Sequence, residues 1–253
     1  MFFKLFFITA ITFGSVTRTK DTLFVAVENS DNYPFSKITS SGEPIGLHAD
    51  LINAVTKKAG LKVHWVPLPW NRAILSVKRG EVDAISYVSP TKERMSDMSF
   101  RPHNSLHTEQ ICVVVRRDFK EKKFNGKIES LFGEKVGLAT NYIPSSEIVA
   151  NKNKFQLFEY TVDGERIIAM LIAGRFDYTF ANNLGYVRSQ SNPRYEKTVK
   201  LSPCLHGDKR YIAFSKRSVG AEDKGLIFEN AMEAFKKTSE YKKVMSLYGV
   251  TDI

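Results

Sequence analysis

Arg94 is the residue of this sequence best suited to hold an anion. It follows an apolar segment and a turn that contains Ser89 and Thr91, and a strand-turn-helix position favours anion binding. A guanidinium presents a planar fork of donors to a carboxylate and keeps its charge at any physiological pH. The alternative is a surface arginine paired with Glu93 or Asp97. We expect Arg94 to bind a carboxylate.

The histidines and cysteines form no catalytic or metal-binding motif. The 5 histidines are scattered, without a metal-binding helix motif, a Ser-His-Asp signature or a nucleophile elbow. Cys112 and Cys204 match no metal spacing, so we expect neither a metal nor a cofactor. In an oxidising compartment they would form one disulfide, and two buried free thiols are the alternative.

The positive charge of the chain is dispersed. The formal net charge is +10, but the cations occur in separated pairs such as Lys57 with Lys58 and Arg116 with Arg117. Such spacing is typical of solvated faces, whereas nucleic-acid binding proteins more often show a clustered stripe with stacking aromatics. We therefore expect no nucleic-acid partner. A basic exterior could still steer an anionic ligand or an acidic partner toward the protein.

The N-terminus has the order of a secretory signal. Lys4 precedes a short apolar run from Leu5 to Gly14, which is too short to span a bilayer. A buried first strand or helix is the alternative, but the next apolar segment, 23–27, already reads as a first strand. We expect residues 1–19 to be a signal peptide. No cysteine lies near that boundary, so we expect a periplasmic protein without a lipid anchor.

The first half of the chain predicts parallel strands. With 43% hydrophobic residues and no long flexible tether, the chain suits one body or two closely joined lobes. Its predicted elements are a strand at 23–27, a helix around 47–55 that ends before Gly60, a strand at 61–66, a helix at 71–79 that ends before Gly80, and a strand at 82–88. This alternation of strands and helices requires parallel pairing.

The second half repeats part of the first. Gly80 and Asp83 have counterparts in Gly174 and Asp177, each set placed between an amphipathic helix and a strand. Segments 110–115 and 210–215 bracket this half and read as two crossovers between lobes. We expect an α/β fold with lobe 1 at 20–109 and 210–253 and lobe 2 at 110–209. A helical tail at 226–248 could cap either lobe.

These segments resemble one known family in the right order. The resemblance rests on 23–28, Tyr33-Pro34-Phe35, 42–51, 80–84, the run from Ser89 to Arg94, 98–100 and 211–216. They are similar to the family 3 extracellular solute-binding proteins, the receptors of polar amino acid ABC importers. The resemblance implies a type II periplasmic binding fold, in which two lobes of mixed, mostly parallel sheet are joined by two hinge strands. It also implies closure around a ligand by hinge motion.

The resemblance assigns ligand-binding roles in lobe 1. Arg94 matches the arginine that grips the ligand's α-carboxylate, and Ser89 and Thr91 match residues whose hydroxyls or amides complete that site. Either could instead cap the helix that begins near Thr91. Tyr87 aligns with the mouth of the cleft, and Glu28 with a position near the ligand's amine or side chain.

An aromatic wall is also expected. Tyr33, Phe35 and Trp70 would give apolar contact and cation–π attraction to an ammonium. For Phe35 the alternative is an aromatic residue of the core. Some divergent members of the family share the Pro-Trp-x-Arg pattern at Trp70. Arg72 is therefore either a second cation of the site or a solvated arginine at a helix start.

Lobe 2 departs from the pattern of the amino acid receptors. Asn182 stands where the family usually has an aspartate that accepts the α-ammonium, and an amide has no charge to offer. Asn141 and Tyr142 replace a small Gly-Thr loop, and Tyr142 would fill ligand space or stack on a ring. A carboxylate ligand without an α-ammonium is therefore an open alternative.

We expect a monomeric solute-binding protein that delivers a small polar ligand to an ABC permease in the inner membrane. Two alternatives remain at this stage. One is an enzyme of the same fold, similar to the periplasmic cyclohexadienyl dehydratases, for which Glu28 or His48 could serve as acid or base. The other is a sensory protein that docks on a membrane receptor.

Overall fold

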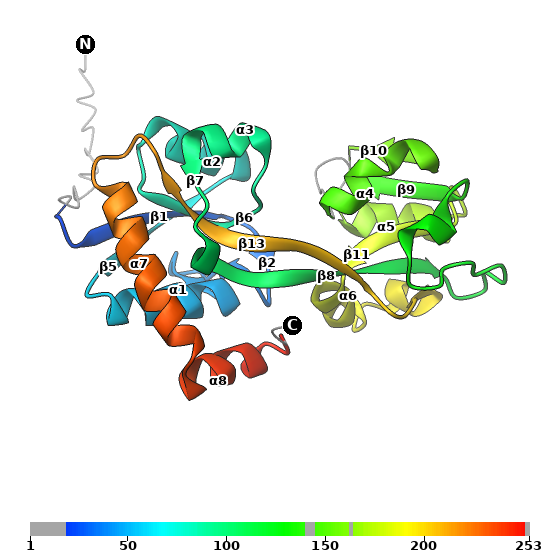
Figure 1. Ribbon diagram of the computed structural model, residues 1–253. Helices are drawn as coiled ribbons and strands as arrows, with labels where there is room; N and C mark the ends of the chain where they lie inside the picture. Colours follow the sequence, from blue (N-terminus) through cyan, green and yellow to red (C-terminus); the bar gives the residue numbers. More distant parts are fainter. Residues whose placement is uncertain (1–18, 140–144, 162–163, 251–253) are drawn as a thin grey trace, which may run out of the picture.

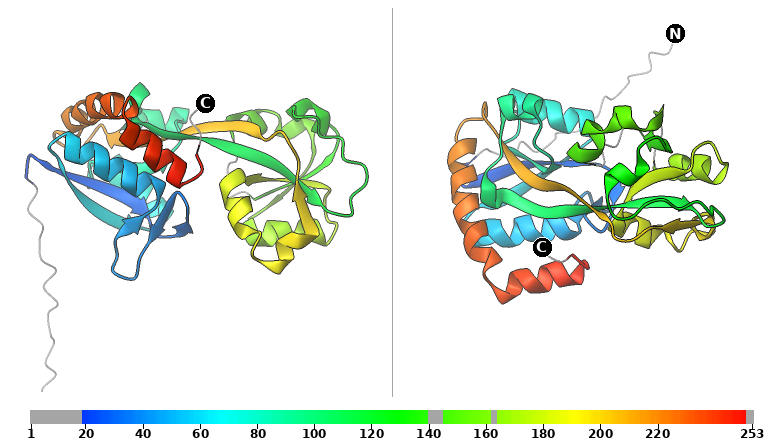
Figure 2. Two further views of the ribbon diagram at one scale, coloured as in Figure 1. Left: turned by 90° about the horizontal axis from the view of Figure 1, so that it is seen from below. Right: turned by 45° about the vertical axis from the view of Figure 1, so that its right-hand side comes forward.

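Two α/β lobes lie at opposite ends of a pair of long strands (Figure 1). The structure, a computed structural model, describes residues 19–139, 145–161 and 164–250. Figure 2 shows from two further sides that the long strands run from one lobe into the other. The expected signal peptide lies outside the described residues, apart from Thr19.

Lobe 1 is built on three parallel strands in the order β5 (Lys62–Leu68), β1 (Thr22–Glu28) and β6 (Ala84–Val88). Alternate residues of β1 enter two cores because successive side chains of a strand point to opposite faces. Leu23 and Val25 pack toward α1 (Leu47–Lys58), α7 (Ala221–Lys236) and α8 (Ser239–Leu247). Phe24 and Ala26 pack toward α2 (Trp70–Arg79). The helical tail therefore belongs to lobe 1, as two helices rather than one.

Lobe 2 repeats this design with the strand order β10 (Gln156–Tyr160), β9 (Lys135–Ala139) and β11 (Tyr178–Asn182), all parallel. Its helices are α4 (Ser146–Ala150), α5 (Gly164–Ile172) and α6 (Asn183–Ser189). Gly137 on β9 is required here because a Cβ would lie 2.3 Å from the ring of Phe176.

The connecting strands make the two sheets continuous. β8 (Ser105–Arg116) and β13 (Leu205–Ser215) pair with each other antiparallel, β8 continues the sheet of lobe 2 and β13 that of lobe 1. Cys112 on β8 is joined by a disulfide to Cys204, next to the start of β13. The expected two-lobed architecture with two hinge strands is confirmed, and both crossovers are longer than the sequence indicated.

The remaining elements are short. They are β2 (Asp31–Asn32), β3 (Ser36–Ile38), β4 (Pro44–Ile45), α3 (Lys92–Asp97), β7 (Met98–Ser99), β12 (Thr198–Lys200) and four 3₁₀ turns at Pro102–Asn104, Ile128–Leu131, Lys152–Lys154 and Pro193–Lys197. Strands β2 to β4 form a small antiparallel sheet beside lobe 1. Among the described residues no helix is long and apolar enough to cross a membrane.

Candidate functional site

A cleft of about 680 Å³ lies between the lobes. Lobe 1 contributes Tyr33 and Tyr87, and lobe 2 contributes the carboxyl ends of β9 and β11, which include Asn182. An open α/β sheet offers backbone amides and helix N-termini at the carboxyl ends of its strands, so this is where ligands of such folds bind. Three of the expected site residues therefore line one cavity.

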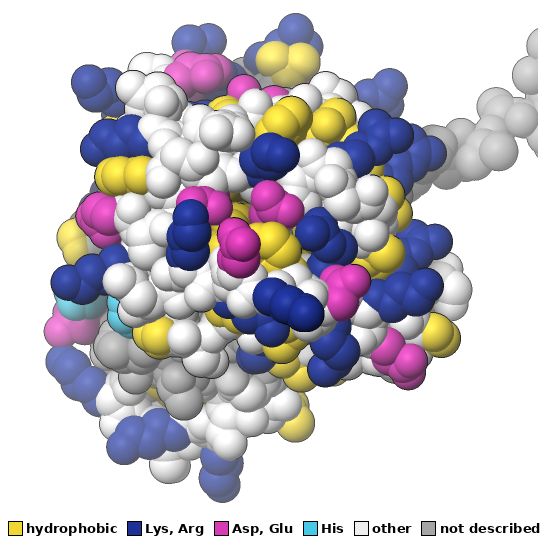
Figure 3. All heavy atoms as spheres, turned by 90° about the vertical axis from the view of Figure 1, so that its right-hand side faces the viewer, with side chains coloured by type: hydrophobic (Ala, Val, Ile, Leu, Met, Phe, Trp, Pro, Cys, Tyr) yellow, Lys and Arg dark blue, Asp and Glu magenta, His cyan; other side chains and the backbone are white. Residues whose placement is uncertain are grey.

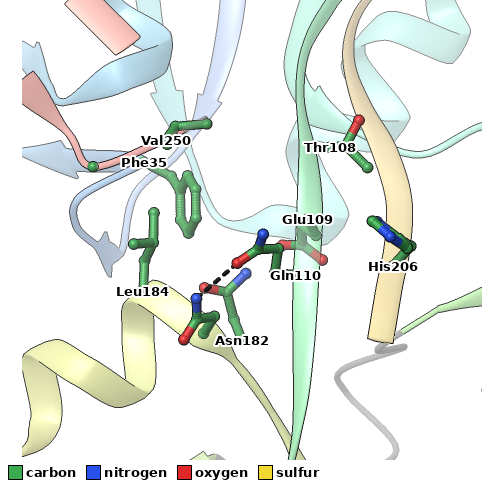
Figure 4. Close-up of a pocket in the computed structure, with 10 residues that line it drawn as sticks. Phe35, Thr108, Glu109, Gln110, Asn182, Leu184, His206 and Val250 are labelled. Carbon is green, nitrogen blue, oxygen red and sulfur yellow. Dashed lines mark hydrogen bonds between the residues drawn. The ribbon is translucent and has the colours of Figure 1, made fainter. Parts of the chain in front are cut away.

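A smaller hollow of about 30 Å³ lies next to the hinge strands. Figure 4 shows the apolar side chains of Phe35, Leu184 and Val250 on one side of it and the polar side chains of β8 on the other. Asn183 donates a hydrogen bond of 2.8 Å to Gln110, which ties α6 to β8. Both lobes and the hinge strands therefore line this hollow.

Arg94 belongs to α3, a helix on the side of lobe 1 nearer to lobe 2 (Figure 1), and it is not among the residues that line the cleft. Its guanidinium lies 5.5 Å from the ring of Trp70 and donates a 3.1 Å hydrogen bond to the carbonyl of Ser89. Burial lowers the pKa of Arg94, and the positive charge of Arg210 lowers it further. Among the described residues no carboxylate forms an ion pair with Arg94, so its charge is available to an anion.

The hydroxyls of Ser89 and Thr91 form hydrogen bonds with other groups of the protein. Thr91 accepts a 3.2 Å hydrogen bond from the amide of Arg94 and so caps α3. The Ser89 hydroxyl accepts a hydrogen bond from Arg210. Both residues thus shape the turn that presents Arg94, and their backbone amides remain candidates for ligand contact.

A buried network on the hinge strands supports this turn, and the sequence did not indicate it. Arg210 on β13 is ion-paired with Glu109 on β8, and the Tyr87 hydroxyl donates a 2.6 Å hydrogen bond to Glu109. Tyr87 has φ of 61°, a conformation that is costly for a bulky residue and recurs at binding sites. The sequence placed Arg210 at the start of the second expected crossover, whereas Glu109 lies just before the first.

His48 and His107 form a second buried pair behind Tyr87. His48 Nε2 and His107 Nδ1 share a 3.0 Å hydrogen bond, and Phe35 stacks on both rings. Burial lowers the pKa of His48 to about 3 and that of His107 well below its usual value, with Arg210 adding to both shifts. His48 is only 1% exposed, so it is shielded from a ligand in the cleft.

The other expected residues of lobe 1 have separate environments. Glu28 accepts a 2.9 Å hydrogen bond from the Asn32 side chain. Arg72 is exposed on the first turn of α2, which suits a solvated arginine. Tyr33 lies under the guanidinium of Arg188, an arginine of lobe 2 that also lines the cleft and that the sequence did not indicate.

In lobe 2, Asn182 caps α6 by accepting a 3.1 Å hydrogen bond from the amide of Gly185. The capping role is compatible with either asparagine or aspartate at this position, because both are good N-caps. Asn141 and Tyr142 lie outside the described residues. Over the end of the molecule formed by lobe 2, lysine and arginine side chains are spread with acidic side chains between them (Figure 3), as the sequence predicted.

Comparison with known proteins gives a consistent result. Residues 23–249 match the sequence profile of the bacterial extracellular solute-binding proteins, family 3. A probable histidine-binding protein of Neisseria gonorrhoeae is 25% identical over 89% of this chain and 82% of its own length. The histidine-binding periplasmic protein of Escherichia coli K12 is 25% identical over 87% of this chain and 85% of its own.

Solved structures share the fold at lower identity. An ancestral arginine-binding protein bound to arginine superposes with a TM-score of 0.68 at 23% identity, over 90% of this chain and 98% of its own. A histidine kinase sensor domain superposes with a TM-score of 0.70 at 21% identity, over 91% of this chain and 98% of its own. An ancestral amino acid-binding protein, described as a precursor of cyclohexadienyl dehydratase, superposes with a TM-score of 0.66 at 20% identity. The match covers 90% of this chain and 96% of that protein.

Proposed function

The chain belongs to the bacterial extracellular solute-binding proteins of family 3, and on this premise we propose that it captures an amino acid or a related small carboxylate between its lobes for import. The observation that supports a carboxylate ligand is Arg94. Its partly buried guanidinium lies 5.5 Å from the ring of Trp70 and has no ion-pair partner among the described residues. Bidentate binding of a carboxylate would satisfy this guanidinium.

Delivery to an ABC permease and capture by hinge closure are part of the same proposal. They are supported by the family, by relatives named as histidine-binding proteins, and by the two strands that connect the lobes. We further propose a monomer that is exported through a signal peptide at 1–19, with lobe 1 at 20–109 and 210–253 and lobe 2 at 110–209. Binding without chemical conversion is favoured because His48, one of the two candidate acids or bases, is buried away from the cleft.

A thermal-shift screen tests this function. The mature protein is scanned with histidine, arginine, glutamine, dicarboxylates and aromatic acids, since a ligand that binds the folded state raises the melting temperature by mass action. We expect at least one carboxylate to do so. Arg94→Ala should remove the shift, while Arg72→Ala, a matched control on the neighbouring helix, should keep it. A screen without any shift, or a shift that survives Arg94→Ala, would contradict the proposal.

A further inference from the structure

Helix α6 is the part of lobe 2 that reaches lobe 1. Leu184, on its first turn, packs against the core formed by β1, α1, α7 and α8. Arg188 follows one helical turn later on the same face, because residues four apart are neighbours on a helix surface. This face of α6 is therefore directed at lobe 1.

Arg188 is joined to lobe 1 by several contacts. Its Nη1 donates to Asp31 Oδ1 at 3.1 Å and to the carbonyl of Tyr33 at 2.9 Å, and its Nη2 donates to Asp31 Oδ2 at 3.5 Å. The guanidinium also lies 4.9 Å from the centre of the Tyr33 ring. The hydrogen bond from Arg188 holds the pKa of Asp31 well below its usual range, and Lys37 of lobe 1 adds to this. Asp31 is therefore ionised at neutral pH.

We propose that Arg188 and Asp31 form a latch that holds the lobes together across the mouth of the cleft and strengthens binding of every ligand equally. This inference rests on the proposed binding function, because both residues line the same cleft. Every partner in the latch belongs to the chain itself, so the latch can form without a ligand. The ion pair stabilises the arrangement of the lobes in which both residues line the cleft. Stabilising an arrangement that is competent to bind raises the affinity of every ligand by the same factor.

Three single variants and one double variant test the latch. Asp31→Asn and Arg188→Gln each break it, and both side chains are partly exposed, so the fold should be kept. Lys37→Gln is the matched control, because it removes the other ion pair of Asp31, which lies within lobe 1. The double variant of Asp31 and Arg188 should behave like Arg188→Gln, which already removes every contact of the latch. Asp31→Asn alone leaves the contacts of Arg188 with Tyr33 and should have a smaller effect.

The first measurement needs no ligand. Spin labels on cysteines introduced at exposed positions, Lys57→Cys on α1 and Arg175→Cys after α5, report the distance between the lobes by double electron–electron resonance. We expect longer distances in Asp31→Asn and Arg188→Gln than in the parent and in Lys37→Gln. Equal distances in all four proteins, or additive effects in the double variant, would overturn the latch.

The second measurement is titration calorimetry with each ligand that the thermal-shift screen yields. Loss of the latch should weaken all of them by one common factor, roughly two- to five-fold for a partly exposed pair. A factor that differs between ligands would overturn the proposal, since it would make Arg188 or Asp31 a contact of the ligand. A protein that binds no carboxylate would refute the proposed function and leave the distance result standing.

Discussion

Glu109 on one hinge strand is ion-paired with Arg210 on the other, and both side chains are almost wholly buried, at 0% and 9% exposure. Removing one member of a buried pair leaves an uncompensated charge, which typically costs about 3–5 kcal/mol. We expect Glu109→Gln to lower the free energy of unfolding in urea by about 3 kcal/mol.

The control for this prediction is Glu233→Gln. Glu233 makes exposed contacts only, with Lys237 at the end of α7 and with His103. Their removal should change stability by less than about 0.5 kcal/mol. Equal effects of the two substitutions would show that the hinge pair adds nothing beyond a surface pair.

The buried histidines should make stability depend on pH. His48 has a pKa of about 3 in the folded protein against 6.5 when unfolded, so the unfolded chain takes up its proton first as the pH falls. The free energy of unfolding should therefore decrease from about pH 6.5 down to about pH 3, by at most ~1.4 kcal/mol per pH unit for each histidine. Below that range this contribution is fully lost.

Carboxylates also titrate in this range, so the informative quantity is a difference between variants. The slope of unfolding free energy between pH 6.5 and 4.5 should be smaller in His107→Gln than in the parent. An unchanged slope in His107→Gln would contradict the assignment.

Asn182→Asp restores the aspartate that the amino acid receptors of this family usually have at this position of lobe 2. An aspartate can keep the cap of α6 by accepting from Gly185, and it adds a negative charge to the cleft lining. Folding stability should stay within about 0.5 kcal/mol, while affinity for α-amino acids measured by calorimetry should rise several-fold. Affinity for carboxylates without an ammonium should fall. Weaker binding of both classes would mean that Asn182 contacts the ligand through its amide.

The disulfide should contribute substantially to stability. Cys112 and Cys204 are separated by 92 residues, and closing a loop of that size restricts the unfolded chain by about 4–5 kcal/mol in the loop-entropy model. The double substitution to alanine should lower the urea midpoint accordingly, and adding a reductant should lower it only in the parent. A reductant effect in the double variant would point to another cause.

The sequence predicted the local parts of this structure well. Strand β1, helix α1 and the ends at Gly60 and Gly80 follow from periodicity and stop signals that act over a few residues. The division between α7 and α8 was missed, although Thr238, whose side chain accepts from the amide of Tyr241, is a good helix cap.

The candidate site was harder to predict because its side chains meet across long separations. The Ser89 hydroxyl accepts from an arginine 121 residues away, and Glu109 pairs with the same arginine 101 residues away. No periodicity encodes such contacts. The type of Arg94 suggested an anion site, but the placement of its neighbours could come only from the folded structure.

Both ends of the described chain lie on lobe 1, Thr22 at the start of β1 and Val250 against the core beside α8, while lobe 2 is a single insertion between the hinge strands (Figure 1). Fluorescent proteins fused at these two ends would therefore both be attached to lobe 1, and the distance between them would not report motion between the lobes. A biosensor built from this protein needs one fluorophore inserted into lobe 2, and a surface turn there is the place to put it.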